Sequence, residues 1–231
     1  MCGRFTQQRP TAELAEIFDA EPLVEDAEPR FNVAPTDGIV AVVRPPSDHR
    51  LLTAFRWGLI PAWADDPKVG SRHINARAES VFTSPTFRTS VRRRRCLIPA
   101  DGFYEWRRTP DGAKQPYLIH HQDRTPLALA GLWASWKEPA SGEWLRSATI
   151  ITTAANPLVA RLHDRMPVIL PPTAWPLWLD PELSDIGELR GLLVPAPAGE
   201  LEAYPVSTLV NSVRNEGAAL VDPIEGEVLR A

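Results

Sequence analysis

The sequence is poor in cysteine and has no long apolar segment. Only Cys2 and Cys96 occur among the 231 residues, so counting allows one disulfide and excludes a disulfide-rich scaffold. No apolar run reaches the about 18 residues that a membrane-spanning helix needs. The N-terminus also lacks the basic and apolar stretches of a secretory signal. We therefore expect a cytoplasmic protein that avoids membranes and keeps its cysteines reduced.

An excess of basic charge is missing as well. The 25 lysines and arginines are outnumbered by 29 aspartates and glutamates, which gives a formal net charge of −4. Any surface for nucleic acid must therefore be a local basic patch. Glycine-rich phosphate-binding patterns, a Gly-x-Ser-x-Gly elbow and the Cys/His spacing of a zinc site are also absent. His120 and His121 are neighbours that point to opposite faces of a predicted strand. We expect neither a cofactor nor a metal.

Proline and tryptophan, by contrast, are frequent. The chain has 24 prolines and 8 tryptophans, and 44% of its residues are hydrophobic. This composition predicts a single domain over residues 1–231, with many short elements joined by stiff turns. Extended segments such as residues 39–43 and 51–57 follow one another, while a short helix that starts near Pro10 is expected within residues 6–20, and further helices at residues 84–94 and late in the chain. This order favours an α+β fold with a mainly antiparallel sheet and peripheral helices.

Cys2 is the residue with the most distinctive chemistry. If Met1 is removed, Cys2 becomes a 1,2-aminothiol whose amine titrates near pH ~8 and whose thiol titrates near ~8.5, so both are partly nucleophilic at neutral pH. The amine can condense with an aldehyde, after which the thiol closes a thiazolidine ring. Alternatively, the amine can serve as the base for the thiol, as in N-terminal nucleophile hydrolases. The structural alternative is a small, inert, buried residue in a first strand.

Three further polar residues stand in apolar surroundings. Asn75 shares a predicted strand face with Arg77 and Glu79, and that face is either solvent-exposed or part of a site. Glu105 lies between two aromatic residues, so it either points outward or is held where its pKa is raised, which suits proton transfer near neutrality. His163 ends a predicted helix and can exchange protons near neutral pH, although a structural role fits a single histidine equally well.

Arginines are the candidate contacts for anions. Arg92 to Arg95 form a run of four that fans around a predicted helix, so they cannot all serve one ligand and are expected to be mainly solvated. Arg4, Arg77 and Arg165 are isolated in the sequence, and each lies near a candidate catalytic residue. These three are the better candidates for phosphate contacts.

Taken together, these segments resemble one family. Six motifs, beginning with Met-Cys-Gly-Arg-Phe, occur in the order seen in SRAP (SOS-response-associated peptidase) proteins, at residues 1–5, 32–36, 57–61, 74–79, 95–106 and 163–167. Residues 206–217 also resemble the end of the family pattern. The resemblance covers essentially the whole chain. It implies the SRAP fold, with a barrel-like antiparallel core, and we expect a monomer.

The resemblance implies a protein that recognises abasic sites in single-stranded DNA and crosslinks to them through Cys2, close to the nucleoid if the protein is bacterial. The open form of an abasic sugar carries the aldehyde that an aminothiol traps. In the implied roles, Cys2 forms the thiazolidine and Asn75 holds Cys2 or the sugar in place. Glu105 would move protons between the sugar and the amine, and His163 would protonate the ring oxygen.

The same resemblance implies a set of DNA contacts. It comprises arginines for phosphates, one contact to the DNA backbone and two residues for base stacking, namely Arg4, Arg77, Arg165, Thr152, Pro35 and Trp63. Two positions depart from the family pattern, because Pro85 stands where an arginine can occur and Ala64 where a second tryptophan can occur. Arg88 is expected to supply the missing charge.

Three other functions remain open at this point. Glutamine amidotransferase domains also begin with Met-Cys-Gly, so an N-terminal nucleophile amidohydrolase is one alternative. Cysteine, histidine and asparagine together also suit a cysteine peptidase, whose narrowest form would be self-removal of Met1. A binder that only shields single-stranded DNA is the third alternative. Whether Met1 leaves by self-cleavage or through an aminopeptidase is also open.

Overall fold

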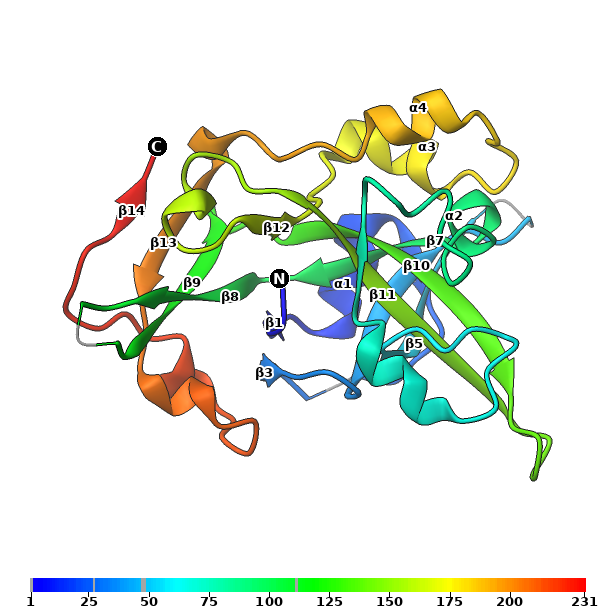
Figure 1. The fold of residues 1–231 in the computed structure, drawn as a ribbon, viewed down its shortest axis with the longest axis horizontal. Coiled ribbons are helices and arrows are strands. Elements are labelled where there is room, and N and C mark those ends of the chain that lie inside the picture. Colours follow the sequence, from blue (N-terminus) through cyan, green and yellow to red (C-terminus); the bar gives the residue numbers. More distant parts are fainter. Residues whose placement is uncertain (1, 27, 47–48, 111) are drawn as a thin grey trace.

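Two β-sheets form the centre of the protein (Figure 1). The computed structural model describes residues 2–26, 28–46, 49–110 and 112–231. The first sheet has six strands in the order β14-β13-β9-β8-β1-β3, and all its neighbouring strands are antiparallel. Its strands are β1 (Phe5–Gln7), β3 (Arg30–Val33), β8 (Gly102–Arg108), β9 (Lys114–His121), β13 (Leu201–Pro205) and β14 (Leu229–Arg230).

The second sheet has eight strands and closes on itself. Its strands are β2 (Ala20–Pro22), β4 (Gly38–Val43), β5 (Arg50–Trp57), β6 (Asn75–Arg77), β7 (Arg95–Ala100), β10 (Leu127–Lys137), β11 (Trp144–Ala154) and β12 (Arg165–Pro167). The order β5-β4-β7-β10-β11 is antiparallel, and a parallel pairing of β11 with β5 completes a five-stranded barrel. The predicted α+β fold with a mainly antiparallel, barrel-like core is therefore confirmed.

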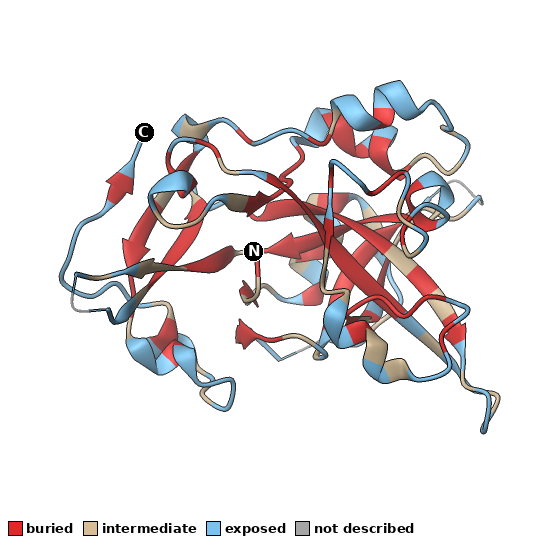
Figure 2. Ribbon diagram, viewed as in Figure 1, coloured by how far each residue is buried: buried red, intermediate tan, exposed pale blue. Residues whose placement is uncertain are grey.

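The barrel strands are apolar on both faces, because different parts of the chain cover each face. On β10, Leu127 and Leu129 belong to one buried cluster, whereas Ala128 and Ala130 belong to another. The first cluster also contains residues of the six-stranded sheet such as Phe103, and the second contains helical residues. Figure 2 shows the buried positions running along the central strands. Strands covered on both faces therefore appear as continuous apolar segments rather than alternating ones.

Among the described residues, four short α-helices lie at the periphery. They are α1 (Thr11–Phe18), α2 (Ser90–Arg93), α3 (Trp175–Leu179) and α4 (Ile186–Gly191). Figure 1 shows α3 and α4 together at one edge of the molecule. Helix α1 buries Leu14 and Phe18 against the barrel, and the Phe18 ring stacks on Trp175 at 4.6 Å between centroids.

One predicted helix forms as the sequence pattern suggests, and another is shorter. The short helix expected within residues 6–20 is α1, which begins just after Pro10, and strand β1 precedes it because Thr6 pairs with Gly102 in the sheet. The helix expected at residues 84–94 is reduced to α2, preceded by turns. Several hydroxyl side chains in that segment can compete with helical hydrogen bonds, which explains the shorter helix.

The start of the chain lies deep in the molecule. Strand β1 sits between β8 and β3, and Figure 1 shows it near the centre. Phe5 pairs with Phe103, and the backbone N–H of Tyr104 donates to the carbonyl of Arg4 at 3.0 Å. The same direction of the chain carries Cys2 and Gly3 toward Glu105, whose charge acts on the Cys2 thiol. The fold therefore brings the N-terminal segment to the middle of β8.

Candidate functional site

Cys2 is fully buried and lies just before β1. Its side chain belongs to the apolar cluster shared by both sheets, and both cysteines are free, so the disulfide allowed by counting does not form. Burial raises the pKa of the Cys2 thiol, and the nearby charge of Glu105 raises it further. The thiol is therefore protonated at neutral pH. It needs a proton acceptor before it can act as a nucleophile.

Asn75 holds Cys2 by its backbone. The Asn75 side-chain Nδ2 donates to the Cys2 carbonyl at 2.8 Å. Strand β6 is positioned by its parallel pairing with β11, and the indole Nε1 of Trp57 donates to the carbonyl of Ile74 at 3.0 Å. Among the described residues, the buried Oδ1 of Asn75 has no hydrogen-bond donor, so it offers an acceptor at the site.

The strand face expected for Asn75, Arg77 and Glu79 is only partly correct. Strand β6 ends at Arg77, so Glu79 lies in the turn that follows rather than on the strand. Arg77 is exposed, whereas Asn75 is half-buried. Of the two alternatives for this face, the solvent-exposed one applies to Arg77, which faces solvent. The other, part of a site, applies to Asn75, which is held against Cys2.

Glu105 points inward. The residue is 3% exposed on β8, and burial raises the pKa of its carboxyl to about 7, with a further contribution from the charge of Asp164. Its neighbours are fixed, because the Tyr104 hydroxyl donates to the Phe31 carbonyl at 2.7 Å and the Trp106 indole donates to Asn211 Oδ1 at 2.7 Å. Of the two alternatives for Glu105, the structure selects the buried carboxyl that exchanges its proton near neutrality.

His163 is partly accessible, with a side chain that is 33% exposed. Its Nδ1 accepts the backbone N–H of Arg165 at 3.0 Å, which places the proton of the neutral ring on Nε2. The Asp164 carboxylate lies 2.8 Å from the same Nδ1, and this contact becomes an ion pair only when the ring is protonated. Burial lowers the pKa of the ring, so the neutral form with an Nε2 proton dominates at neutral pH.

Glu105 and His163 meet at one cavity of ≈ 810 Å³. The rest of its lining is rich in basic and amide side chains and comprises Trp106, Arg107, Arg108, Lys114, Arg161, Leu162 and Asn211. The sequence-based prediction did not include the basic residues of this lining. The signal was present in the alternation along β8, because Arg107 lies two residues beyond Glu105 on the same strand face.

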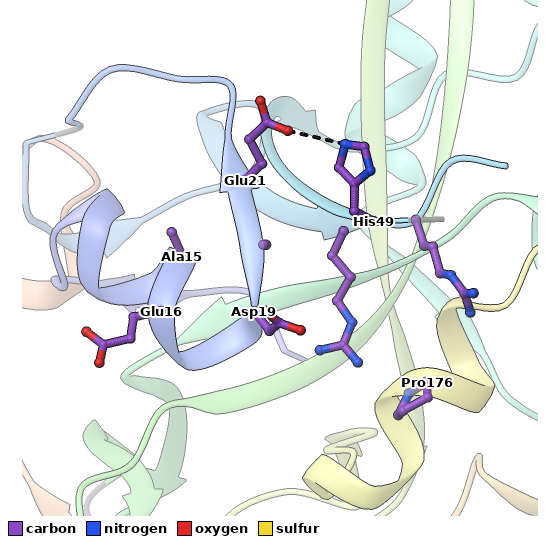
Figure 3. A pocket seen from close by; sticks show the side chains of 9 residues that line it. Ala15, Glu16, Asp19, Glu21, His49 and Pro176 are labelled. Carbon is purple, nitrogen blue, oxygen red and sulfur yellow. Dashed lines mark ion pairs between the residues drawn. The ribbon is translucent and has the colours of Figure 1, made fainter. Parts of the chain in front are cut away.

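A second cavity of ≈ 750 Å³ lies elsewhere and contains none of the predicted site residues. Figure 3 shows Glu21 of its lining next to His49, with Glu16 and Asp19 farther away. His49 Nε2 lies 3.2 Å from Glu21 Oε2, and both side chains are more than half exposed. This hollow is open and polar, with no buried reactive group, so the cavity at Glu105 is the better candidate site.

Two of the predicted DNA contacts already have partners within the protein. Arg165 forms a bidentate ion pair with Glu79 at 2.5 and 3.0 Å, and it donates to the Thr152 carbonyl at 2.7 Å. Thr152 is itself buried on β11. Arg4 donates to Asn32 Oδ1 at 2.6 Å and to the carbonyl of Val210 at 2.9 Å. Both arginines are thus oriented by the fold, and a phosphate would have to share or replace these partners.

The remaining predicted contacts are more open. Arg77 and Arg88 are exposed, Trp63 is 64% exposed and Pro35 is half-buried. Arg77 lies opposite Thr152 in the β6–β11 pairing, so it belongs to the same strand group as Arg165. No contact in the described parts of the chain joins Trp63, Pro35 or Arg88 to that group.

The arginine run is only partly solvated. Arg95 is 4% exposed, and it donates to the Trp178 carbonyl at 2.6 Å and to the Val91 carbonyl at 2.8 Å. Burial lowers the pKa of its guanidinium to about 10. The expectation of a mainly solvated run is therefore wrong for Arg95, because it binds the carbonyls that end two neighbouring segments.

The described residues also bear on metal sites and membrane spans. Those residues hold no group of three or more His, Cys, Asp or Glu side chains placed to bind a metal ion. None of their helices has both the length and the apolar character to cross a membrane.

The fold and site define a class of protein in which a barrel-centred α+β domain buries a cysteine, an amide and a carboxyl beside a histidine-lined cavity. The sequence model of the SOS response associated peptidase (SRAP) family matches residues 1–213. The chain belongs to this family.

Named relatives and solved structures agree with this assignment. The chain is 42% identical over 224 residues to the abasic site processing protein YoqW of Bacillus subtilis, covering 96% of this chain and 99% of the relative. It is 33% identical over 233 residues to the abasic site processing protein YedK of Escherichia coli, covering 97% and 100%. A crystal structure of a protein from Bacteroides thetaiotaomicron, 24% identical, shares the fold with a TM-score of 0.85 over 97% of this chain and all of that one.

Proposed function

We propose that this protein recognises abasic sites in single-stranded DNA and becomes covalently linked to them through Cys2. The observation that carries the proposal is the placement of Cys2, which Asn75 holds at 2.8 Å beside a carboxyl with a pKa of about 7. The relatives named abasic site processing proteins support the choice of substrate. An abasic sugar supplies an aldehyde, which is the electrophile that suits an N-terminal cysteine.

The proposed reaction begins with hydrolysis of the Met1–Cys2 peptide bond, which frees the Cys2 amine. The amine attacks the aldehyde carbon, a C–N bond forms and the carbonyl oxygen leaves as water, giving an imine. The thiol then adds to the imine carbon, a C–S bond forms and the thiol proton ends on the ring nitrogen. The hydrolysis consumes one water and releases methionine, and the later steps give the thiazolidine and one water.

Glu105 is the proposed proton carrier in this sequence. An N-terminal amine titrates near pH ~8, which is within about one unit of the Glu105 pKa, so proton transfer between them is nearly balanced. The carboxylate can take a proton from the ammonium and later give it to the departing water. The raised pKa of the Cys2 thiol makes the amine the first nucleophile and leaves the thiol for ring closure.

His163 is the proposed donor to the sugar. Because Nδ1 accepts the Arg165 N–H, the proton of the neutral ring sits on Nε2, and His163 lines the cavity together with Glu105. That proton can be given to the ring oxygen of the closed sugar, which opens the ring and exposes the aldehyde. A mutant that lacks the ring is therefore expected to react slowly with closed sugar.

The proposed DNA contacts follow the strand group beside the site. Arg77 and Arg165, beside Thr152 on β11, would bind phosphates, and Arg4 would do so from the N-terminal segment. Trp63 and Pro35 would stack on bases, with Arg88 adding charge. Every member of the proposed catalytic set lies within one chain, so the proposed reaction needs no residue from a second copy.

A denaturing gel tests the proposed function. The purified protein is mixed with a single-stranded oligonucleotide that contains one abasic site, and with the same oligonucleotide undamaged. We expect a band that resists SDS only with the abasic strand, and we expect Cys2→Ser to abolish it. A protein lacking Met1 that yields no such band would overturn the proposal. Glutaminase or peptidase activity lost in the same variant would favour the hydrolase alternatives instead.

A further inference from the structure

We propose that the basic wall of the cavity beside Glu105 binds phosphates of the strand that flanks the abasic site, and that Glu227 covers this wall in the free protein. The basic wall is Arg107, Arg108, Lys114 and Arg161. The inference rests on the proposed function and deepens it, because it assigns a flanking-strand contact and a segment of the protein that competes with DNA.

The position of the basic wall links it to the reacting groups. Arg107 lies two residues beyond Glu105 on β8, so both side chains leave the same face of the strand. Arg161 lies two residues before His163 and lines the same cavity. A sugar held between Glu105 and His163 would therefore have its neighbouring phosphates within the cavity that these arginines line.

The charges of the wall are not balanced by the sheet. Arg108 pairs directly with Lys114 across β8 and β9, and both are exposed. Like charges in directly opposed positions destabilise a strand pair. Neither side chain forms an ion pair within the described ranges. An anion bound between them would relieve this repulsion, and a phosphate backbone supplies anions at regular spacing.

Glu227 occupies part of the wall. Its Oε2 lies 2.7 Å from Arg107 Nη1, and its other oxygen accepts a hydrogen bond from Arg161 Nη2. These hydrogen bonds lower the pKa of the Glu227 carboxyl, so it is ionised at neutral pH. A carboxylate that bridges two guanidinium groups makes the contacts that a phosphate would make in the same place.

The Glu227 side chain is suited to release. Residues 222–228 are exposed, and Figure 1 shows the segment passing the hairpin of β8 and β9. Its backbone is held on both sides of Glu227, by the Ile224 N–H that donates to the Pro205 carbonyl at 3.0 Å and by the buried Leu229 of strand β14, so only the Glu227 side chain has to move. Exposed ion pairs contribute little to stability, so several phosphates can displace one carboxylate without unfolding the strand.

Binding measurements test both halves of the proposal. The probe is a single-stranded oligonucleotide carrying a tetrahydrofuran, which mimics an abasic site and has no aldehyde. For Arg107→Gln/Arg161→Gln we expect affinity to fall roughly tenfold at low salt, and the slope of log affinity against log salt to shrink by about 1.4. Unchanged affinity and slope would overturn the contact, provided that circular dichroism shows a folded variant.

The covering role is tested by a matched pair of variants. Glu227→Gln removes the bridging carboxylate, so we expect a several-fold gain in affinity at low salt that disappears at high salt. Glu225→Gln makes the same change in charge within the same exposed segment and has no ion pair among the described residues, so we expect no gain. Equal gains in both variants would show only an effect of net charge and would overturn the covering role.

A final arm separates this inference from the proposed function. If wild-type protein forms no crosslink with abasic DNA and does not bind the probe, the proposed function fails and this inference fails with it. If wild type crosslinks while Arg107→Gln/Arg161→Gln binds normally, only this inference fails.

We also expect oligonucleotides truncated on one side of the lesion to lose the effect of these substitutions, and those truncated on the other side to keep it. Loss of the effect with neither truncation would contradict a flanking-strand contact.

Discussion

At the scale of single residues, the site depends on one carboxyl that is buried where it cannot ionise easily. Glu105 is 3% exposed, and its pKa is raised to about 7. A carboxyl that is buried in an active site is expected to lower the free energy of unfolding once it becomes charged. The proposed function therefore has a measurable consequence for folding.

Glu105→Gln should change how stability depends on pH. The carboxyl titrates at its ordinary value of 4.5 when unfolded and at about 7 when folded. Its stabilising contribution is fully present below pH 4.5 and is lost as pH rises to about 7, a loss of about 3 kcal/mol in the free energy of unfolding. Urea unfolding from pH 4.5 to 8 should show that the variant lacks this loss.

The control for this experiment is Glu225→Gln, an exposed carboxyl in the C-terminal segment. We expect its stability to follow that of wild type at each pH. A constant difference between wild type and Glu105→Gln across the whole range would contradict a raised pKa at Glu105.

The same substitution should slow crosslinking. In wild type, the rate should fall as pH drops below about 7, because a protonated Glu105 cannot accept the proton of the Cys2 ammonium. The amide of Glu105→Gln cannot accept it at any pH, so we expect a loss of roughly 10²–10⁴-fold in rate without that dependence. Binding of the tetrahydrofuran probe should stay unchanged. Lost affinity with a normal rate would contradict the proton-transfer role.

At the scale of elements, a pair of glycines brings the end of β5 close to the turn at residues 67–72 that precedes β6. Gly58 has a φ of +119°, and a methyl group there would lie 2.6 Å from the Gly70 carbonyl oxygen. Gly58 follows Trp57, whose indole holds the carbonyl of Ile74 next to Asn75. Close approach of these backbones is thus part of what places Asn75 against Cys2.

Gly58→Ala should therefore destabilise the protein, and Gly38→Ala should not. We expect Gly58→Ala to lower the free energy of unfolding by roughly 1–3 kcal/mol from backbone strain, with the clash adding to it. Gly38 has open space around its Cβ position and is exposed, so the change there should stay within about 0.5 kcal/mol. Chemical denaturation of both variants gives the comparison. Equal changes in the free energy of unfolding of the two variants would show that the contact between Gly58 and Gly70 does not contribute to stability.

Local sequence signals predicted some elements well and others poorly. The segments around Ile39 and Phe55 form strands where expected, because apolar β-branched and aromatic residues dominate them. The short first helix also forms where expected, whereas strand β1 before it depends on the pairing of Thr6 with Gly102, a partner that is distant in the sequence. Short helices and strands of two or three residues carry too little periodicity to be recognised.

At the scale of the whole molecule, the site exists only because the fold joins distant segments. Residue types and the family resemblance indicated Cys2, Asn75, Glu105 and His163, but the direction of Glu105 and the burial of Cys2 depend on tertiary packing. The basic wall at Arg107 and its contact with Glu227 could not be predicted, because they join β8 to the C-terminal segment. The ion pair between Arg165 and Glu79 is a further contact that joins distant segments.

The two sheets should unfold together. One apolar cluster contains Phe103 of the six-stranded sheet and Ile98 of the barrel, and the Phe5 ring packs edge-on against Trp57 at 5.0 Å between centroids. Tryptophan fluorescence and far-ultraviolet circular dichroism should therefore report coincident transitions in denaturant. Two separated transitions would contradict a shared core.

The most direct test of the central claim is intact-mass spectrometry of the protein after reaction with an abasic oligonucleotide. We predict a species whose mass equals the protein without Met1 plus the oligonucleotide minus one water, and fragmentation should place the adduct on Cys2. Reaction at another residue, or a crosslink formed while Met1 is still attached, would contradict the account.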